Sequence, residues 1–567
     1  MPKRTPRVAD LDLCGCSLRS LTISREENVT RRSRSWSLVA AAAALSLLAS
    51  ACSGSGGDGD DEGSGNGAEK SAQGGTFTYA LTEPTFLAPA QKCYESECIA
   101  VVSVVQEPLL NVDLETGEPV YDGIAESIES EDNTTWTVKL KDGWTFHNGE
   151  PVNADAFMRA WNWSANVDNG SDTAGFMSKI EGYDAEKAVE SLSGLKKVDD
   201  LTLEVTLSAP FSQLPQMMSY TPAWSPLAEA CLEDLEACNE TPIGTGPYKM
   251  DGAWRHDQGI TVVRNEEYAG EHPGNVDSIE FTMYTDMVAA FRAWQAGELD
   301  VTDVDPTMYP TAKSEAGDRQ LEEESSAFTY LGLTEKAPYD NPDLRHALSM
   351  AIDRQTIIDS ILNGLHSPAM DVISPVVPGA RDDACQFCGF DPEEAKKLFD
   401  EAGGVPGNTI TLWYNAGSGH DGWVEAIGNS WKETLGVDFK LEAREWAQYL
   451  ELRSEAKFTG PYRLSWIVDY PSAENYLRPL YGTNGDVNYY GYSNDAVDTA
   501  ITEGDAAADL DEGVAKYQEA ADLVLEDMPV IPLWFGKANY VWSENVSGVE
   551  YDVNLANIDL RNVVVAG

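Results

Sequence analysis

The segment from Trp136 to Asp155 reads WTVKLKDGWTFHNGEPVNAD and contains several kinds of local structure in a short span. Its first residues alternate between apolar and polar side chains with a period of two, which is typical of a half-buried β-strand. A tight turn around Gly149 follows, and we expect His147 to belong to that turn and not to a ligand site. Residues 155–163 then gather their apolar side chains on one face of a helix. The segment therefore predicts a strand, a turn and a helix in quick succession.

The same two periodicities recur along the rest of the chain. Alternating segments predict strands, and segments with apolar residues three and four apart predict helices. The predicted strands are 76–81, 135–140, 201–207, 281–284 and 437–441, and the predicted helices are 155–163, 289–296, 341–352, 424–435 and 445–457. This mixture predicts α/β lobes. Because no strongly polar linker interrupts residues 75–567, we expect the domains to be interleaved along the chain.

Composition excludes several classes of protein. The chain has 567 residues, with 39 Lys and Arg against 94 Asp and Glu, which gives a formal net charge of −55 at pH 7. Such a surface repels phosphate backbones and anionic lipids, so nucleic-acid binding is excluded. The 15 Trp, 23 Tyr and 15 Phe can build large cores, which excludes a chain that is disordered throughout. Beyond residue 52 no apolar run is long enough to span a membrane, so we expect a soluble body.

Residues 1–52 have the composition of an export signal. The basic segment 31–36 precedes the apolar run 38–51, and small residues lead up to Cys52. This order resembles a bacterial lipoprotein signal, which implies that residues 1–51 are removed and that Cys52 carries lipid. The alternative is an ordinary signal peptide cleaved nearby, with Cys52 incidental. Residues 52–74 would then be a flexible acidic Gly/Ser tether that holds the exported protein at the extracellular face of the cytoplasmic membrane.

Six cysteines are left in the exported part, and they form three close pairs: Cys93 with Cys98, Cys231 with Cys238, and Cys385 with Cys388. An even number of cysteines in an oxidising compartment predicts local disulfides. The last pair also has the spacing of two metal ligands, but no second such pair and no cluster of histidines completes a site. We therefore expect three disulfides and no metal.

No catalytic motif is present in the sequence. The chain has no G-x-S-x-G elbow, no H-E-x-x-H and no Walker loop. The glycine-rich segment Gly244–Tyr248 contains Pro247 and leads into a strand, which indicates a turn. With 94 acidic residues, chance pairs of carboxylates are inevitable and do not indicate a glycosidase. The sequence predicts neither an enzyme nor a cofactor.

Five segments, in order, resemble the family 5 extracellular solute-binding proteins of ABC importers, and most of all their oligopeptide-binding members. The segments are 136–155, 205–210, 244–248, 341–354 and 529–535. The resemblance implies an α/β, two-lobed periplasmic-binding-protein fold of class II type, with an extra α/β domain inserted in lobe one. It places lobe one at 75–112, 209–327 and 530–567, the inserted domain at 113–208, and lobe two at 328–529.

The resemblance also implies a ligand site in lobe two. Members with the pattern W-x-x-D-Y use its aspartate to bind the free α-amino group of a peptide, and Asp469 has that place here. Arg463 would receive the carboxylate end of the peptide. A cap or turn role for Asp469, and an ion pair within the protein for Arg463, are the alternatives. The other implied contacts are His420, the aromatic walls Trp446 and Trp466, Tyr470, and the backbone of Ser465 and Ile467, which would pair with an extended ligand.

On lobe one, the ligand loop of the family falls near residues 92–97. Cys93 stands where relatives have an acidic contact, and Tyr94 and Glu95 follow it. We expect Tyr94 to contact the ligand, in a loop whose shape a disulfide would fix.

The function implied is that of a membrane-tethered receptor for short peptides. It would close on its ligand by hinge motion and dock on the transmembrane subunits of an ABC permease with their ATPase, as a monomer that touches the membrane only through its lipid. Two alternatives stay open at this point. One is the same role for another small solute, such as a nickel complex or an oligosaccharide, and the other is a sensor lipoprotein outside transport.

Overall fold

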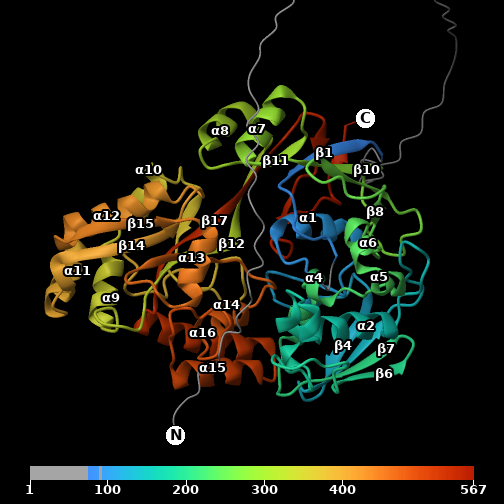
Figure 1. The fold of residues 1–567 in the computed structure, drawn as a ribbon, viewed down its shortest axis with the longest axis horizontal. Coiled ribbons are helices and arrows are strands. Elements are labelled where there is room, and N and C mark those ends of the chain that lie inside the picture. Colours follow the sequence, from blue (N-terminus) through green and yellow to red (C-terminus); the bar gives the residue numbers. More distant parts are fainter. Residues whose placement is uncertain (1–73, 89–91, 567) are drawn as a thin grey trace, which may run out of the picture. The chain divides into compact units, whose positions relative to one another are not determined.

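The computed structural model describes residues 74–88 and 92–566. An 11-stranded mixed sheet runs through this part of the chain (Figure 1). Its strands, in spatial order, are β15 (Asp438–Arg444), β14 (Thr409–Asn415), β16 (Tyr462–Trp466), β12 (Gln320–Gly332), β17 (Val530–Trp542), β11 (Val301–Asp303), β1 (Thr76–Leu81), β10 (Ser278–Met283), β9 (Gly259–Arg264) and β8 (Tyr248–Met250), with β13 (His366–Pro368) also paired to β17.

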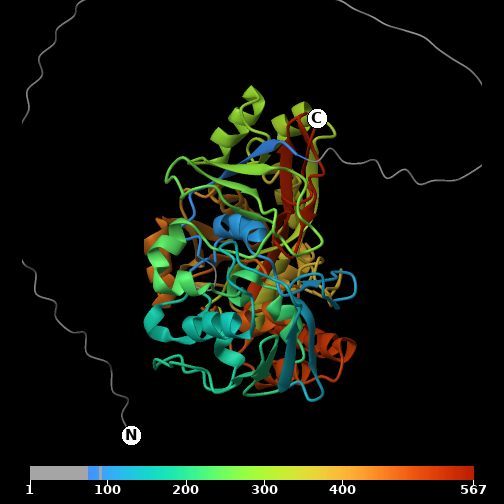
Figure 2. The same cartoon turned by 90° about the vertical axis from the view of Figure 1, so that its right-hand side faces the viewer.

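Two long antiparallel strands join the two ends of this sheet. β12 and β17 pair from Gln320 opposite Val541 to Gly332 opposite Val530. β17 also pairs with β11, and β12 also pairs with β16. Figure 2 shows β17, in red, running beside β12. These two strands therefore connect two strand groups within one sheet. One group is β15, β14 and β16 on the β12 side, and the other is β11, β1, β10, β9 and β8 on the β17 side.

A second sheet of four strands lies within residues 125–206. Its order is β4 (Ala125–Ser130), β5 (Thr135–Leu140), β7 (Thr202–Thr206) and β6 (Leu195–Asp199), and α2 (Ala154–Ala165) packs against it. The buried core around them extends from Leu109 to Cys238 and also takes in Tyr470. This packing passes residue 208, where the sequence analysis ends the inserted domain, and the domain boundaries stay a prediction.

The remaining elements are helices and short strand pairs. The helices are α1 (Ser96–Val105), α3 (Leu214–Met218), α4 (Thr221–Trp224), α5 (Glu229–Glu233), α6 (Leu235–Glu240), α7 (Met287–Ala296), α8 (Tyr309–Ala316), α9 (Pro342–Met350), α10 (Arg354–Ser360), α11 (Pro392–Glu401), α12 (Asp421–Leu435), α13 (Trp446–Ser454), α14 (Glu474–Tyr481), α15 (Asp495–Asp505) and α16 (Leu510–Asp527). The strand pairs are β2 (Asn111–Val112) with β3 (Pro119–Val120), β18 (Val546–Ser547) with β21 (Val564–Val565), and β19 (Tyr551–Asp552) with β20 (Asn557–Ile558).

Local sequence explains where several helices begin and end. The side chain of Asn153 accepts a hydrogen bond from the Ala156 amide, 3.1 Å away, at the start of α2. Asn341 caps α9 in the same way through the Asp343 amide. α7 ends at Gly297, whose φ of 74° is the left-handed conformation that a side chain disfavours. Each strand and helix that the sequence predicts is present; 76–81 and 135–140 have the predicted bounds, and the ends of the others differ by a few residues.

His147 has the structural place that the sequence predicts. Its ring and its backbone form hydrogen bonds with the Gly244–Gly246 turn, and Nδ1 accepts one of them from the Gly244 amide at 3.2 Å. Burial lowers its pKa to about 4, so the ring is neutral. Among the residues that the structure describes, no helix is both long and apolar enough to cross a membrane, and no group of three or more His, Cys, Asp or Glu side chains could hold a metal ion.

Candidate ligand-binding site

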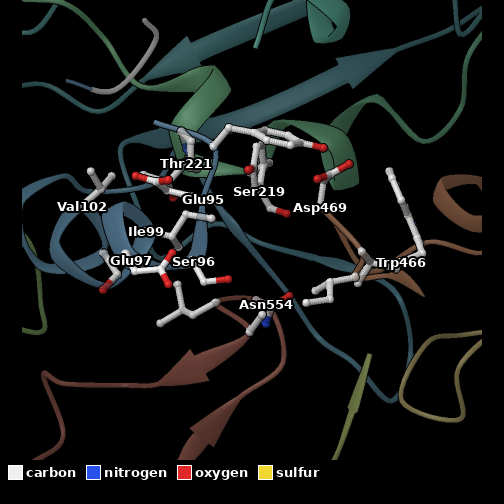
Figure 3. A pocket seen from close by; sticks show the side chains of 18 of the residues that line it. Glu95, Ser96, Glu97, Ile99, Val102, Ser219, Thr221, Trp466, Asp469 and Asn554 are labelled. Atoms are coloured by element: carbon white, nitrogen blue, oxygen red, sulfur yellow. The ribbon is translucent and has the colours of Figure 1, made fainter. Parts of the chain in front are cut away.

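A cavity of about 420 Å³ lies between the start of α1 and the end of β16. Parts of residues 94–103, together with 219–222 and 554–556, line one side, and residues 465–469 line the other. Figure 3 shows Ile99 and Val102 across the space from Trp466 and Asp469. The wall combines apolar side chains with hydroxyl, amide and carboxylate groups, as small-molecule sites do.

Asp469 lies on the cavity wall just beyond β16, held by neutral partners. Asn475 accepts from the Asp469 amide at 2.9 Å and donates through Nδ2 to the Asp469 carboxylate at 3.1 Å. The Tyr94 hydroxyl is hydrogen-bonded to the same carboxylate. Burial raises the pKa of Asp469 to about 7, although both hydrogen bonds act to lower it. Within residues 74–88 and 92–566, no cationic side chain pairs with this carboxylate.

In contrast, the charge of the neighbouring carboxylate, Glu474, is compensated by two cationic side chains. Lys179 Nζ lies 3.1 Å and Arg478 Nε 2.8 Å from Glu474 Oε1. Burial raises the pKa of Glu474, but the two cations outweigh this effect and the pKa is lowered overall. The Tyr470 hydroxyl donates to Glu474, and the Tyr470 ring packs in the core around α2. Tyr470 is therefore buried behind Asp469 and does not line the cavity.

Arg463 is a half-buried guanidinium whose described partners are all neutral. Nη2 donates to Ser465 Oγ at 2.9 Å and Nη1 to Asn415 Oδ1 at 3.5 Å, while Nε is buried without a partner. Burial lowers the pKa of Arg463. In a chain with a net charge of −55, an arginine without an acidic partner among the described residues has spare capacity for a carboxylate from outside.

Four predicted contacts are not among the residues that line this cavity: Arg463 and Tyr470, described above, and His420 and Trp446. His420 precedes α12 and its Nδ1 accepts from Trp423 Nε1 at 3.3 Å; burial and then Arg463 lower its pKa to about 4, so the ring is neutral. Trp446 begins α13, is 50% exposed and stacks on Tyr449. Neither lines the 420 Å³ space, whereas Tyr94, Ser465, Trp466, Ile467 and Asp469 do.

The loop that carries Tyr94 is fastened at several points. The structure joins Cys93 to Cys98, and both cysteines are fully buried. Glu95 accepts from the amide and hydroxyl of Thr85, and Glu97 accepts from the Thr82 hydroxyl at 2.8 Å. These carboxylates are engaged in holding the loop, which places Tyr94 at the rim of the cavity. The structure also joins Cys231 to Cys238 and Cys385 to Cys388.

The backbone beside Asp469 offers one open edge. Ser465 and Trp466 pair with Thr329 and Phe328 of β12 on one side. On the other side, β14 meets β16 only at Tyr462, opposite Trp413. Residues 465–467, which line the cavity, therefore have backbone groups free to pair with an extended ligand along that edge.

Several parts of the site were not predicted from the sequence, among them Ile99, Val102 and Ser103 of α1 and Val468. Residues 219–222 and 554–556 enter the wall from segments far apart in the chain, and Asn475 orients Asp469. None of them has a spacing or composition that singles it out. Ala556, with a φ of 49°, has an unusual backbone conformation, but that becomes visible only in the structure.

Comparison with known proteins gives consistent matches over most of the chain. The model of the bacterial extracellular solute-binding proteins, family 5, matches residues 119–488. The chain is 30% identical over 491 residues to the oligopeptide-binding protein OppA of Bacillus subtilis, which covers 82% of this chain and 88% of that protein. It is 28% identical over 469 residues to the periplasmic murein peptide-binding protein MppA of Escherichia coli, covering 80% and 86%.

Solved structures show the same fold. The unliganded open form of the periplasmic murein tripeptide-binding protein MppA has a TM-score of 0.74 at 25% identity, over 87% of this chain and 98% of that one. OppA of Haemophilus influenzae in complex with the peptide RPPGFSPFR has a TM-score of 0.71 at 24% identity, over 88% and 100%. These are two-lobed periplasmic binding proteins, so the predicted α/β, two-lobed fold is confirmed.

Proposed function

Because this chain belongs to family 5 of the bacterial extracellular solute-binding proteins, which are non-enzymatic transport receptors, we propose that it captures short peptides and delivers them to an ABC permease. The observation that carries the proposal is Asp469, a carboxylate on the wall of a cavity with no cationic partner among the described residues. The relatives named above bind oligopeptides and murein peptides, which supports a peptide ligand.

The site has one chemical group for each charged end of a peptide. The ammonium group would pair with Asp469, whose desolvation is costly unless a cation compensates it. The carboxylate end of a ligand of suitable length would reach Arg463, which has spare donors. Between them, the open edge at 465–467 would pair with the peptide backbone, and backbone pairing does not depend on side-chain identity. The arrangement therefore favours recognition of peptides in general over one particular sequence.

Binding would also drive closure. The cavity is lined both by segments assigned to lobe one and by 465–469 of lobe two. A ligand that contacts both lobes at once binds the closed state more tightly than the open state, so it shifts the population toward closure. The closed receptor would then be the form that docks on the transmembrane subunits of the permease.

The placement of the receptor is part of the same proposal. Its family is exported, and the signal-like segment before Cys52 would direct export and lipidation. Cys52 and the tether up to residue 73 lie outside the described residues. A lipid on Cys52 followed by a flexible tether would keep a monomeric receptor close to its permease, where the short tether raises its effective concentration.

Native mass spectrometry of the purified protein tests the ligand class. A series of co-purifying masses that fit peptides of two to five residues would support the proposal. A single non-peptide mass would instead assign the receptor to another solute, and a bound metal would favour a nickel complex. If the protein is empty, titration with tri-alanine gives the answer, and a failure to bind tri-alanine and its longer homologues would refute the proposal.

Substitution of Asp469 tests the amine role. Asp469→Asn removes the charge but keeps the shape of the side chain and one acceptor oxygen, so we expect it to weaken the binding of tri-alanine by about 2–4 kcal/mol and that of N-acetyl-tri-alanine hardly at all. The matched control is Asp318→Asn, which removes an exposed charge after α8. Calorimetric titration measures both ligands. An equal loss for the free and the acetylated peptide would remove Asp469 from this role.

A further inference from the structure

A second cavity, of about 570 Å³, lies directly beyond Asp469. Parts of 172–185 and of 470–487 line it, and three residues belong to both cavities: Tyr94, Trp466 and Asp469. Figure 3 shows Trp466 and Asp469 together on the same side of the first cavity. The two spaces therefore meet at a common partition.

Tyr94 is the member of this partition that comes from the facing lobe. Its side chain is 43% exposed, although its hydroxyl is hydrogen-bonded to the Asp469 carboxylate. The Asp469 charge and then burial raise the pKa of Tyr94, so the hydroxyl stays protonated and donates. The Cys93–Cys98 link and the Glu95 bonds to Thr85 hold the loop on which the ring stands.

This bond leaves room for a ligand on Asp469. An ionised carboxylate offers about four lone-pair positions, and Asn475 and Tyr94 occupy two of them. A ligand ammonium can take the remaining positions from the side of the 420 Å³ cavity. Tyr94 does not have to leave for the amine to bind, so its ring can stay across the passage between the two spaces.

We propose that Tyr94 sets the amino-terminal boundary of the ligand, because its ring closes the passage from the 420 Å³ cavity into the 570 Å³ cavity. The inference rests on the proposed peptide function and goes beyond it. In this view the receptor selects peptides with a free amino terminus for two reasons: Asp469 pairs with the ammonium charge, and the Tyr94 ring blocks a longer or acetylated amino end. A peptide blocked or extended at its amino end would have to displace the Tyr94 ring in order to bind in register.

The charges of the second cavity indicate which extension would fit once the barrier is gone. Its two cations, Lys179 and Arg478, are engaged by Glu474 and Asp505. Asp172 and Asp486 also line it, and neither has an ion-pair partner among the described residues. The net charge of its wall is negative, so a basic extension should be favoured over an acidic one.

The test compares three proteins with four peptides in calorimetric titrations. The proteins are wild type, Tyr94→Ala and Tyr94→Phe, and the peptides are tri-alanine, N-acetyl-tri-alanine, and acetyl-Lys-Gly and acetyl-Glu-Gly extensions of tri-alanine. Tyr94→Phe is the matched control, because it removes the hydroxyl and keeps the ring. Because Tyr94 is partly exposed, we expect both variants to fold.

We expect wild type and Tyr94→Phe to bind tri-alanine more tightly than the extended peptides by on the order of 100-fold. The extended peptides bind more weakly because they must displace the ring and because they have no free amine to pair with Asp469. In Tyr94→Ala this preference should fall at least about tenfold, through a gain in affinity for the extended peptides, and the lysine extension should bind more tightly than the glutamate one.

Two results would overturn the inference alone. One is a Tyr94→Ala variant that keeps the wild-type preference while tri-alanine still binds, and the other is a Tyr94→Phe variant that loses the preference as fully as Tyr94→Ala. A wild-type protein that binds none of the four peptides would instead overturn the peptide function, and the inference with it.

Discussion

Asp469 and Glu474 are two acidic residues five positions apart with opposite roles. Glu474 has Lys179 and Arg478 within 3.1 Å, so its charge is compensated inside the protein. Among the described residues Asp469 has only the neutral partners Asn475 and Tyr94, and burial raises its pKa to about 7. The uncompensated carboxylate is the one that faces the cavity, so the charge that a ligand can neutralise is at the site itself.

The raised pKa of Asp469 predicts that peptide binding depends on pH. An ammonium ligand needs the ionised carboxylate, so below pH 7 binding must first remove a proton from Asp469. Affinity for tri-alanine should therefore fall by about tenfold per unit as the pH drops well below 7, and it should fall again above about pH 8, where the α-amino group of the peptide loses its proton. His420, with a pKa of about 4, does not titrate in this range.

Titrations between pH 5 and 8.5 check this dependence, and Asp469→Asn serves as the control, since it should bind weakly at every pH. A wild-type affinity that is flat between pH 5 and 8 would show that Asp469 does not change its protonation when the ligand binds.

Arg463 predicts a dependence on the other end of the ligand. Arg463→Gln removes the charge and keeps a polar side chain beside Ser465, so a tripeptide with a free carboxylate should lose about 1–3 kcal/mol of binding free energy. The same peptide as a carboxyl-terminal amide should lose little. The matched control is Arg444→Gln, because Arg444 is already paired with Glu442 at the end of β15. An equal loss for the acid and the amide would make Arg463 a structural residue.

At the scale of single elements, the loop before α1 and the edge of β16 form the two faces of the site. The loop is fixed by a disulfide and by the hydrogen bonds that Glu95 and Glu97 accept from threonines in the segment after β1. The edge of β16 is fixed by its pairing with β12. Both faces are therefore rigid before ligand arrives, which lowers the entropic cost of binding.

Removal of the loop disulfide should affect binding more than stability. A link that closes a loop this short contributes about 2 kcal/mol to the free energy of unfolding, and Cys231–Cys238 closes a loop of similar length. The double variants Cys93→Ser/Cys98→Ser and Cys231→Ser/Cys238→Ser should thus unfold at similar denaturant concentrations. We expect only the first to lose affinity for tri-alanine, because only its loop carries Tyr94.

Denaturation followed by intrinsic fluorescence and calorimetric titration of both variants make the comparison. If the two variants bind tri-alanine equally well, the loop disulfide has no part in shaping the site.

At the scale of the whole described chain, β12 and β17 make one continuous sheet out of both strand groups. Their backbone links the segments that line the two sides of the cavity. Motion between the lobes must therefore be absorbed where these long strands bend, and their register shifts between Glu324 and Phe328 place an irregularity there.

Peptide binding should bring the two lobes closer together. Spin labels at E298C, after α7, and at E433C, on α12, are on exposed positions of the segments that the sequence analysis predicts as lobe one and lobe two. Saturating tri-alanine should shorten and narrow the distance distribution between them, because the ligand contacts both sides. The same addition to the Asp469→Asn protein, at a concentration that saturates wild type, should leave the distribution broad. An unchanged distribution in wild type would rule out closure on the ligand.

Local sequence was enough to predict the elements, and a resemblance to a family indicated residues on the wall of the candidate site. The alternation in Thr135–Leu140 gave β5 because period-two burial is encoded in the strand itself. Gly297 and Asn341 marked helix ends because caps act within a single turn. Asp469 was found through a motif that resembles a family, and Tyr94 through the position of its loop.

Tertiary packing alone gave the site its shape. Tyr94 and Asp469 are far apart in the chain, and the Asn554–Ala556 and Ser219–Pro222 segments reach the same cavity only after the sheet has formed. Trp446 was predicted as a pocket wall, but it stacks on Tyr449 outside this cavity. The prediction failed because the sequence does not distinguish a tryptophan that lines a site from one that packs elsewhere. Periodicity encodes burial within one element, whereas contacts between elements depend on how distant side chains pack.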